Sequence, residues 1–85
     1  MNETPQITIY GTSWCGSSRR VRHFLDGLNI PYDWKDIELD PEAAEFVEKI
    51  NHGNRSVPTI KLKDGSTLVE PSNSELASKL GIKLE

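Results

Sequence analysis

Cysteine is almost absent from this chain, because Cys15 is the only one among its 85 residues. A single cysteine cannot form an intrachain disulfide, which excludes a secreted scaffold held by disulfides and favours a reducing compartment, the cytoplasm. Long hydrophobic runs are also missing, and residues 1–6 are mostly polar, so we expect neither a membrane span nor a signal peptide. The length fits one small domain over residues 1–85.

An excess of positive charge is missing as well, because the net charge is −3. A chain of this charge has no general basis for binding nucleic acid. The sequence contains no glycine-rich phosphate loop, no paired catalytic carboxylates and no ligand spacing typical of zinc. Because His23 and His52 have no consistent partners for catalysis or metal binding, we interpret both as surface residues.

The run from Thr12 to Ser18 surrounds the cysteine and lies between two regular patterns. An alternating apolar segment precedes it and a segment with helical apolar spacing follows it, so Cys15 is predicted at a strand-to-helix junction. The first N–H groups of a helix are unpaired and carry partial positive charge, which stabilises a thiolate. We therefore predict a reactive thiol, and the alternative is an inert buried cysteine.

Periodicity predicts seven elements in the order βαβαββα. We expect strands over residues 6–10, 32–39, 57–62 and 67–69, and helices over residues 17–28, from residue 41 to near residue 53, and from residue 73 onward. Asp64-Gly65 is a hairpin signal and supplies an antiparallel strand pair, whereas a strand-helix-strand unit supplies a parallel one. The fold class is therefore α/β, with a mixed four-stranded sheet flanked by three helices.

Local signals mark the start of two of these helices. Asp40 precedes Pro41 as an N-cap, and Ser72 with Glu75 resembles a capping box. Apolar spacing further predicts the inward faces of the helices: Val21, Phe24, Leu25, Leu28, Ala43, Phe46, Val47, Ile50, Leu76 and Leu80, with Ala77 as a further candidate. The second strand offers apolar surface through Tyr32, Trp34, Ile37 and Leu39.

Charge is unevenly distributed along the chain. Arg19, Arg20 and Arg22 closely follow the cysteine, whereas the middle of the sequence is acidic. A basic patch beside the thiol suits a small anionic partner, and the alternative is that both charge runs are simply solvated faces. Consecutive helix positions diverge by about 100°, so the three arginines cannot all face the thiol, and we favour Arg19 as the one that stabilises the thiolate.

Three separated segments together resemble the glutaredoxin family, which has the thioredoxin fold. They are residues 12–18 (TSWCGSS), residues 53–59 (GNRSVPT), and Asp64-Gly65-Ser66 leading to residues 70–73 (EPSN). The resemblance covers roughly residues 7–80, and the first two segments are most similar to the mycoredoxin branch. Those proteins are glutaredoxin-like reductases of mixed disulfides with mycothiol.

The resemblance implies a thiol-disulfide oxidoreductase in which Cys15 attacks the mixed disulfide between a protein and a low-molecular-weight thiol. It implies a cis bond at Val57-Pro58 beside the thiol, with the Val57 backbone pairing with the peptide-like part of the ligand. It also implies that Ser72 and Asn73, at the start of the last helix, hold a ligand carboxylate. The expected partners are thiolated proteins and the small thiol, with no tightly bound cofactor and a monomeric protein.

Residues near Cys15 and the Val57-Pro58 bond are further candidates for binding the ligand or stabilising the thiolate. Trp14 would cover the apolar part of a ligand, or would alternatively pack in the core. Gly16 fits either a close approach of the ligand to the backbone or the turn into the helix. Arg55, with Asn54, could reach a ligand carboxylate or be an ordinary solvated side chain. The hydroxyls of Ser17 and Ser18 could donate hydrogen bonds to the thiolate.

Two positions depart from the family pattern. Glutathione-using glutaredoxins commonly carry a lysine where this chain has Thr12, so we favour mycothiol as co-substrate, with glutathione or bacillithiol possible. Dithiol members end the motif in a resolving cysteine where this chain has Ser18. Either Ser18 is native, or it replaces a native cysteine, since the dithiol pattern predominates in the mycoredoxin branch. In both cases only a monothiol cycle is open to Cys15.

A function from another class is also compatible with the Cys-Gly-Ser-Ser motif. Some monothiol glutaredoxins use a similar motif to bridge a [2Fe–2S] cluster between two subunits and two thiol molecules. That class typically has a lysine at the position of Thr12, an aromatic residue at the position of Ser17, and a Trp-Pro loop that is absent near residues 51–55. Cluster transfer is therefore the alternative to mixed-disulfide reduction.

Overall fold

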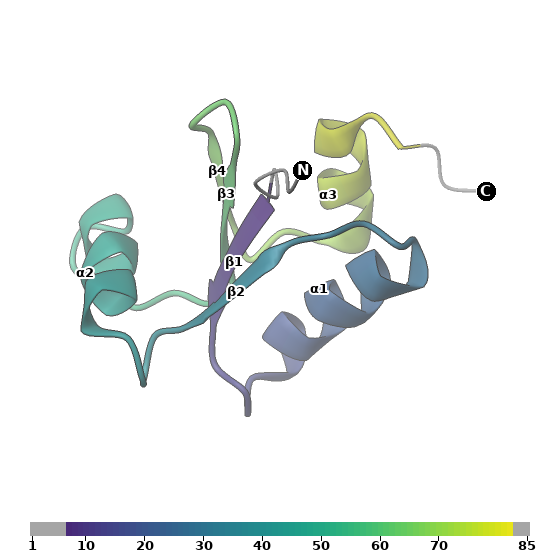
Figure 1. The fold of residues 1–85 in the computed structure, drawn as a ribbon. Coiled ribbons are helices and arrows are strands. Elements are labelled where there is room, and N and C mark those ends of the chain that lie inside the picture. The colour runs from purple at the N-terminus through teal and green to yellow at the C-terminus, as the bar shows by residue number, and fades with distance from the viewer. Residues whose placement is uncertain (1–6, 83–85) are drawn as a thin grey trace, which may run out of the picture.

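A mixed four-stranded sheet forms the centre of the computed structural model, which describes residues 7–82. Its strands are β1 (Ile7–Gly11), β2 (Asp33–Asp36), β3 (Thr59–Leu62) and β4 (Thr67–Val69). They lie side by side in the order β2-β1-β3-β4, with β1 parallel to β2 and both other pairs antiparallel (Figure 1). The predicted mixed sheet and its hairpin are confirmed.

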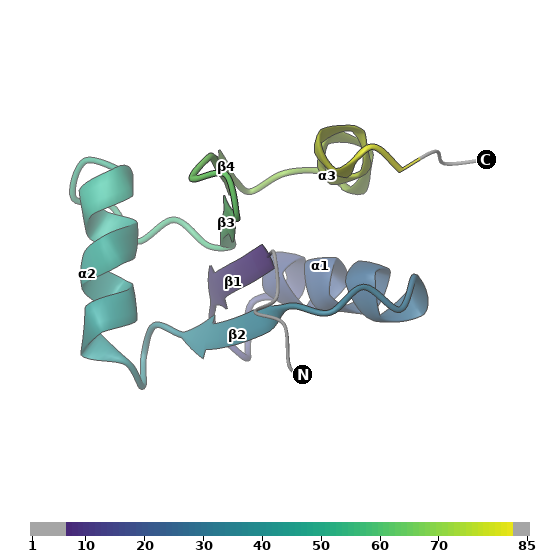
Figure 2. The same cartoon turned by 45° about the horizontal axis from the view of Figure 1, so that its top comes forward.

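Three helices cover the two faces of this sheet. Figure 2 shows α1 (Gly16–Gly27) and α3 (Asn73–Leu80) on one face and α2 (Pro41–Ile50) on the other. The chain order is β1, α1, β2, α2, β3, β4 and α3, which confirms the predicted βαβαββα sequence. Among the described residues, no helix is long and apolar enough to cross a membrane.

The strand β1 supplies side chains to both layers because its residues alternate between the faces. Ile7 and Ile9 enter one hydrophobic cluster with residues of α1, β3 and α3, namely Val21, Leu25, Ile60, Leu62 and Leu76. Tyr10 points to the opposite face and enters a second cluster with Ile37 and the α2 residues Ala43, Ala44 and Val47. Its ring stacks on Phe46 with the ring centroids 4.7 Å apart. The helices are thus held on opposite sides of one strand.

The helix starts follow the local sequence signals. The Asp40 carboxylate accepts hydrogen bonds from the backbone N–H groups of Glu42 and Ala43 at the start of α2. At α3, Ser72 Oγ accepts from Glu75 N at 3.0 Å, and Glu75 Oε1 accepts from Ser72 N at 2.8 Å. Both predicted caps are therefore confirmed.

The predicted second strand is too long. The strand β2 ends at Asp36, whose side chain accepts from Glu38 N at 2.9 Å while its carbonyl accepts from Leu39 N and Asp40 N. These bonds turn the chain out of the sheet. As a result Ile37 packs against residues of α2, whereas Leu39, which was also expected to offer apolar surface, is 82% exposed.

Three other boundaries and one inward position were also predicted incorrectly. The helix α1 ends at Gly27, so Leu28 caps it and is 40% exposed instead of buried. The strand β3 begins at Thr59 and not at residue 57, because Pro58 has no N–H to donate to the ladder. The strand β1 extends one residue further than expected, to Gly11, and the predicted start at residue 6 lies outside the described residues.

Gly11 lies where the end of β1 passes closest to the first turn of α1. A Cβ atom placed on it would lie 2.4 Å from Ser18 Oγ, 3.0 Å from Ser18 Cβ and 3.1 Å from Cη2 of Trp34. Ser18 is completely buried, so it has little freedom to move away. The close packing of β1 against α1 therefore requires a residue without a side chain at position 11.

We predict that Gly11→Ala lowers the free energy of unfolding by about 1–3 kcal/mol, because overpacking forces the strand and the helix apart. Urea denaturation followed by tryptophan fluorescence measures this change. Gly27→Ala is the matched control, since nothing lies within 4 Å of a Cβ at that position. It should leave stability unchanged or raise it by up to about 1 kcal/mol. Equal effects of both substitutions would contradict the steric explanation.

Candidate functional site

Cys15 is the N-cap residue of α1 and follows the turn that leaves β1. Its backbone N–H donates to Thr12 O at 3.3 Å, and its carbonyl accepts from Arg19 N at 3.1 Å. The sulfur is thereby placed at the positive end of a helix of 12 residues, in a half-buried position. The structure thus has the strand-to-helix junction that the sequence pattern predicts.

The segment before β3 approaches the sulfur from the other side. The Val57–Pro58 peptide bond is cis, in agreement with the expectation from the resemblance. The Cys15 thiol lies 4.0 Å from Val57 O, to which it donates a weak hydrogen bond. Pro58 O in turn accepts from Glu70 N at 2.8 Å. Residues from three distant parts of the sequence therefore surround one thiol.

The pKa of the Cys15 thiol is lower than that of an ordinary cysteine. Partial burial raises this pKa, and so does the negative charge of Glu70. Hydrogen bonds from the Ser18 hydroxyl and from the backbone N–H groups of Ser18 and Ser17 outweigh both effects. Ser17 therefore stabilises the thiolate through its backbone N–H and not through its hydroxyl, which was the group expected from the sequence. A larger fraction of the sulfur is thiolate, the nucleophilic form.

Two buried hydroxyls lie on either side of this cysteine in the chain. Neither Thr12 Oγ1 nor Ser18 Oγ has a hydrogen-bond partner that meets strict geometry within the described part of the chain. A buried hydroxyl without a partner costs about 1–3 kcal/mol. Because a thiolate accepts hydrogen bonds more strongly than a thiol, the Ser18 hydroxyl gains its partner when Cys15 loses its proton.

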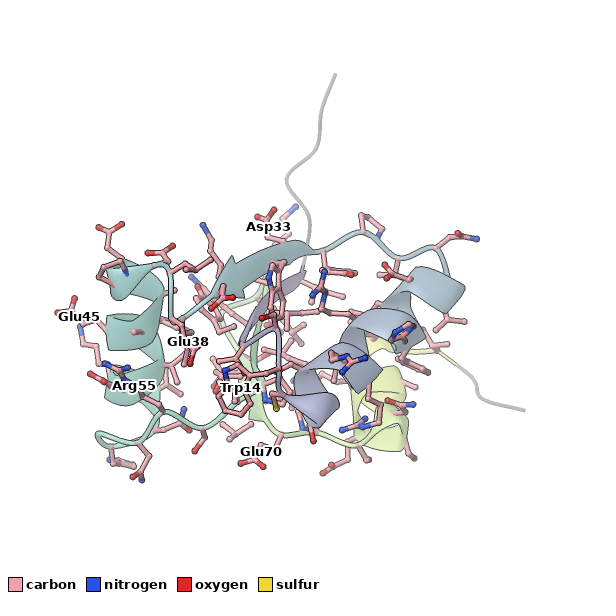
Figure 3. The ribbon with its side chains drawn as sticks, turned by 90° about the horizontal axis from the view of Figure 1, so that it is seen from below. Trp14, Asp33, Glu38, Glu45, Arg55 and Glu70 are labelled. Carbon is pink, nitrogen blue, oxygen red and sulfur yellow. The ribbon has the colours of Figure 1, made fainter. Side chains whose placement is uncertain are left out.

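Trp14 stands beside the cysteine on the surface of the molecule. Its side chain is 66% exposed, which contradicts the alternative of core packing. The indole Nε1 donates to Glu38 Oε1 at 3.0 Å, so the ring is tied to the turn between β2 and α2 (Figure 3). A fixed, exposed indole offers a platform on which part of a ligand can rest.

Gly16 is the first residue of α1 and borders open space. A Cβ atom at this position would meet no atom of the described residues within 4 Å. The backbone of the first helical turn is therefore accessible to a molecule attached to the neighbouring sulfur. Packing inside the protein does not by itself require glycine here.

Several polar groups at the N-terminus of α3 are bonded to side chains of this chain itself. The capping box uses the Ser72 hydroxyl and the Ser72 N–H, both of which are bonded to Glu75. Asn73 Oδ1 accepts from Arg20 at 2.6 Å, and Pro71 O accepts from the same guanidinium at 3.0 Å. Ser72 and Asn73 thus lie at the expected end of α3, where the Ser72 hydroxyl and N–H and Asn73 Oδ1 already have partners. The N–H groups of Asn73 and Ser74 have no partner within residues 7–82.

The three arginines of α1 point in different directions. Arg20 reaches α3, and Arg22 lies over the ring of Trp34 at 4.2 Å from its centroid. Arg19 is exposed, and its charge is not among the causes of the low pKa of Cys15. The role expected of Arg19 in stabilising the thiolate is therefore taken by hydrogen bonds from the helix start.

Arg55 lines a groove beside α2, away from α3. Its guanidinium forms an ion pair with Glu48, so it was correctly placed near the cis proline but has a partner of its own. The groove has a volume of about 540 Å³, and we call it the α2 groove. Its lining residues are Ile37, Glu38, Pro41, Ala44, Glu45, Glu48 and Arg55.

Sequence reasoning missed four residues that shape the site. Glu38 holds Trp14, Glu70 raises the pKa of Cys15, and Arg20 bridges α1 to α3. Glu75 was recognised only as a helix cap, although its carboxylate occupies the expected ligand position. The spacing of the capping box could have indicated that Glu75 competes with a ligand carboxylate. The contacts of Glu38, Glu70 and Arg20 have no local sequence signal.

The features of the site and of the fold together define a class of protein. A nucleophilic cysteine caps the first helix of a βαβαββα fold and faces a cis proline before the third strand. This is the arrangement of a thiol redox protein with the thioredoxin fold. The fold is shared with a mutant of a thioredoxin-like protein, with a TM-score of 0.81 and 23% identity over 92% of this chain and 97% of that one.

The chain belongs to the glutaredoxin family, whose family model matches residues 7–66. It is 52% identical over 77 residues to a glutaredoxin-like protein of Mycobacterium tuberculosis, covering 91% of this chain and 92% of the relative. It is 40% identical over 74 residues to mycoredoxin 1 of Corynebacterium glutamicum, covering 87% and 91%. The glutaredoxin of Methanosarcina mazei has the same fold, with a TM-score of 0.75 and 23% identity over 96% and 85%. The protein is accordingly a thiol-disulfide oxidoreductase of the glutaredoxin and mycoredoxin type.

We predict that Ser18→Ala raises the pKa of Cys15, because the hydroxyl hydrogen bond to the thiolate is lost. With a higher pKa the thiolate fraction at neutral pH falls, and alkylation by iodoacetamide slows. The rate measured across a pH series gives the pKa directly. Ser17→Ala is the matched control, since Ser17 acts through its backbone N–H and should leave the profile unchanged. An unaltered profile in Ser18→Ala would refute the role of this hydroxyl.

Proposed function

We propose that this protein removes mycothiol from mycothiolated proteins through a monothiol cycle at Cys15. In the first step the Cys15 thiolate attacks the mycothiol sulfur of the mixed disulfide. A new disulfide joins Cys15 to mycothiol, and the substrate protein leaves as a thiolate that takes a proton from water. In the second step the thiolate of a free mycothiol attacks the bound mycothiol sulfur. Cys15 is released as a thiolate, and the products are the reduced protein and mycothiol disulfide.

The observation that carries the choice of thiol is the negative charge at the start of α3 and beside the sulfur, from Glu75 and Glu70. Glutathione has two free carboxylates, and a helix N-terminus is a ready site for such a group. Here the Glu75 carboxylate already accepts the N–H of Ser72, and Arg20 is already bonded to Asn73. The charge of Glu70 acts on the same sulfur. A thiol without a carboxylate avoids both the competition and the repulsion, and mycothiol is such a thiol.

The remaining parts of the proposal follow from the chemistry of the cycle. The 40% identity to a protein named mycoredoxin 1 supports mycothiol as the co-substrate. A cycle that depends on free thiol works where thiols are kept reduced, which favours the cytoplasm. Each step needs only one sulfur from this chain, so a monomer suffices. Because Ser18 is no nucleophile towards a disulfide, no internal disulfide competes with release by the free thiol.

Intact-protein mass spectrometry tests the proposed co-substrate. The reduced protein is mixed separately with oxidised mycothiol, oxidised glutathione and oxidised bacillithiol, and the reaction is quenched at short times. We expect the adduct of one mycothiol on Cys15 to form fastest. A Cys15→Ser variant controls for addition elsewhere. Glutathione reacting as fast as mycothiol would contradict the proposed selectivity.

We predict that Glu70→Gln reduces the preference for mycothiol disulfide over glutathione disulfide by about two- to fivefold at low salt. The substitution removes a charge that raises the pKa of Cys15 and repels an anionic ligand. The ratio of the two rates of adduct formation measures the preference, so a general change in thiol reactivity cancels. Asp26→Asn, which removes a charge at the opposite end of α1, should leave the ratio unchanged. A ratio that is equally insensitive to Glu70→Gln would show that this charge does not select the thiol.

A further inference from the structure

We propose that the α2 groove is the binding subsite for the hydroxyl-rich, carboxylate-free part of the small thiol, a sugar or cyclitol unit. This inference rests on the proposed function, since it concerns the same thiol bound at Cys15. In this proposal the two sides of the cysteine differ in the kind of ligand group that they accept. The α3 side disfavours a carboxylate through the charges of Glu70 and Glu75, and the α2 side receives an uncharged polyol.

The shape and lining of the groove suit a polyol. Its floor includes the buried side chains of Ile37 and Ala44, and the exposed ring of Pro41 adds apolar surface on which the C–H face of a ring can rest. Its rim carries carboxylates and a guanidinium, which accept from and donate to hydroxyl groups. The volume of about 540 Å³ is in the range of pockets that bind small molecules.

The groove is connected to the reactive cysteine by one side chain. Glu38 lies on its rim and accepts the hydrogen bond from the indole of Trp14, the residue immediately before Cys15. In Figure 3 the labelled side chains of Glu45, Arg55, Glu38 and Trp14 follow one another across this side of the molecule. A ligand joined to the sulfur can therefore pass over the exposed indole and reach the groove.

The charges of the groove argue against a carboxylate ligand. Glu38, Glu45 and Glu48 bring three negative charges, whereas Arg55 is the one cation of the lining and is paired with Glu48. A ligand carboxylate would be repelled by the net negative charge of the groove. Ligand hydroxyl groups are neutral, so they can donate hydrogen bonds to the glutamate carboxylates without this repulsion. Glu45 forms no hydrogen bond or ion pair with another side chain of residues 7–82, so its oxygens remain available to a ligand.

The test compares two disulfides that differ in the proposed contact. Mycothiol disulfide carries the sugar and cyclitol units, whereas 2-hydroxyethyl disulfide carries neither. The rate of adduct formation at Cys15 is measured for each by quenched-flow mass spectrometry. In the double variant Glu45→Ala with Arg55→Ala we expect the ratio of the mycothiol rate to the hydroxyethyl rate to fall about tenfold, as for the loss of one or two hydrogen bonds.

Glu42→Ala is the matched control for this experiment. It removes a carboxylate from the same helix, but Glu42 lines a separate hollow with Tyr10, Lys35 and Phe46. We expect it to leave the ratio unchanged. Equal slowing with both disulfides in the double variant, or no change with either, would overturn the assignment of the groove.

The remaining outcomes separate this inference from the function on which it rests. If the unsubstituted protein shows no preference for mycothiol disulfide over 2-hydroxyethyl disulfide, the proposed function and the groove fail together. If the preference is present and survives the double variant, only the groove fails. If the double variant slows transfer from a mycothiolated protein with a basic flank but not from mycothiol disulfide, the groove binds the protein partner and the polyol assignment is wrong.

Discussion

The contact between Gly11 and Ser18 joins the end of β1 to the first turn of α1, and the geometry around the cysteine depends on it. The absence of a Cβ at Gly11 lets the helix start against the strand, with Ser18 completely buried. The short turn between them leaves Cys15 as the N-cap, where helix N–H groups and the Ser18 hydroxyl both lower its pKa. Close packing and thiol reactivity therefore have one structural cause. A looser junction would change the position of the sulfur relative to Val57 and the cis proline as well.

Ser18 shows how stability and reactivity are opposed at this junction. Its hydroxyl is buried without a hydrogen-bond partner among residues 7–82, which is unfavourable for folding. The same hydroxyl lowers the pKa of the cysteine, which is favourable for attack on a disulfide. A cysteine at this position would add a second nucleophile close to the first and open a different route of release. With serine, the electrostatic contribution remains while the resolving chemistry is absent.

Much of the architecture was predictable because its signals are local. The alternation along β1, the cap at Asp40 and the capping box at Ser72 each depend on residues within a few positions of one another, and all three were confirmed. The early end of β2 was missed because the Asp36 turn competes with a sequence that has strand-like composition. The site was less predictable, since Arg20 meets Asn73 across 53 residues and Trp14 meets Glu38 across 24. Such contacts depend on how helices pack, and the choice among three consecutive arginines cannot be made before that packing is known.

The surroundings of the sulfur are asymmetric, and this asymmetry bears on which thiol it accepts. Towards α3, the Ser72 N–H and the Arg20 guanidinium are engaged within the protein, and Glu70 and Glu75 bring negative charge. Towards α2, an exposed indole leads to an open groove with an apolar floor and a polar rim. In the proposed function, selectivity comes partly from exclusion, because a ligand with a carboxylate meets repulsion at these groups that a neutral ligand does not. Discrimination of this kind requires little binding energy, so the bound thiol can still be displaced when the second thiol arrives. A weakly held but correctly selected thiol is what a cycle with one cysteine requires.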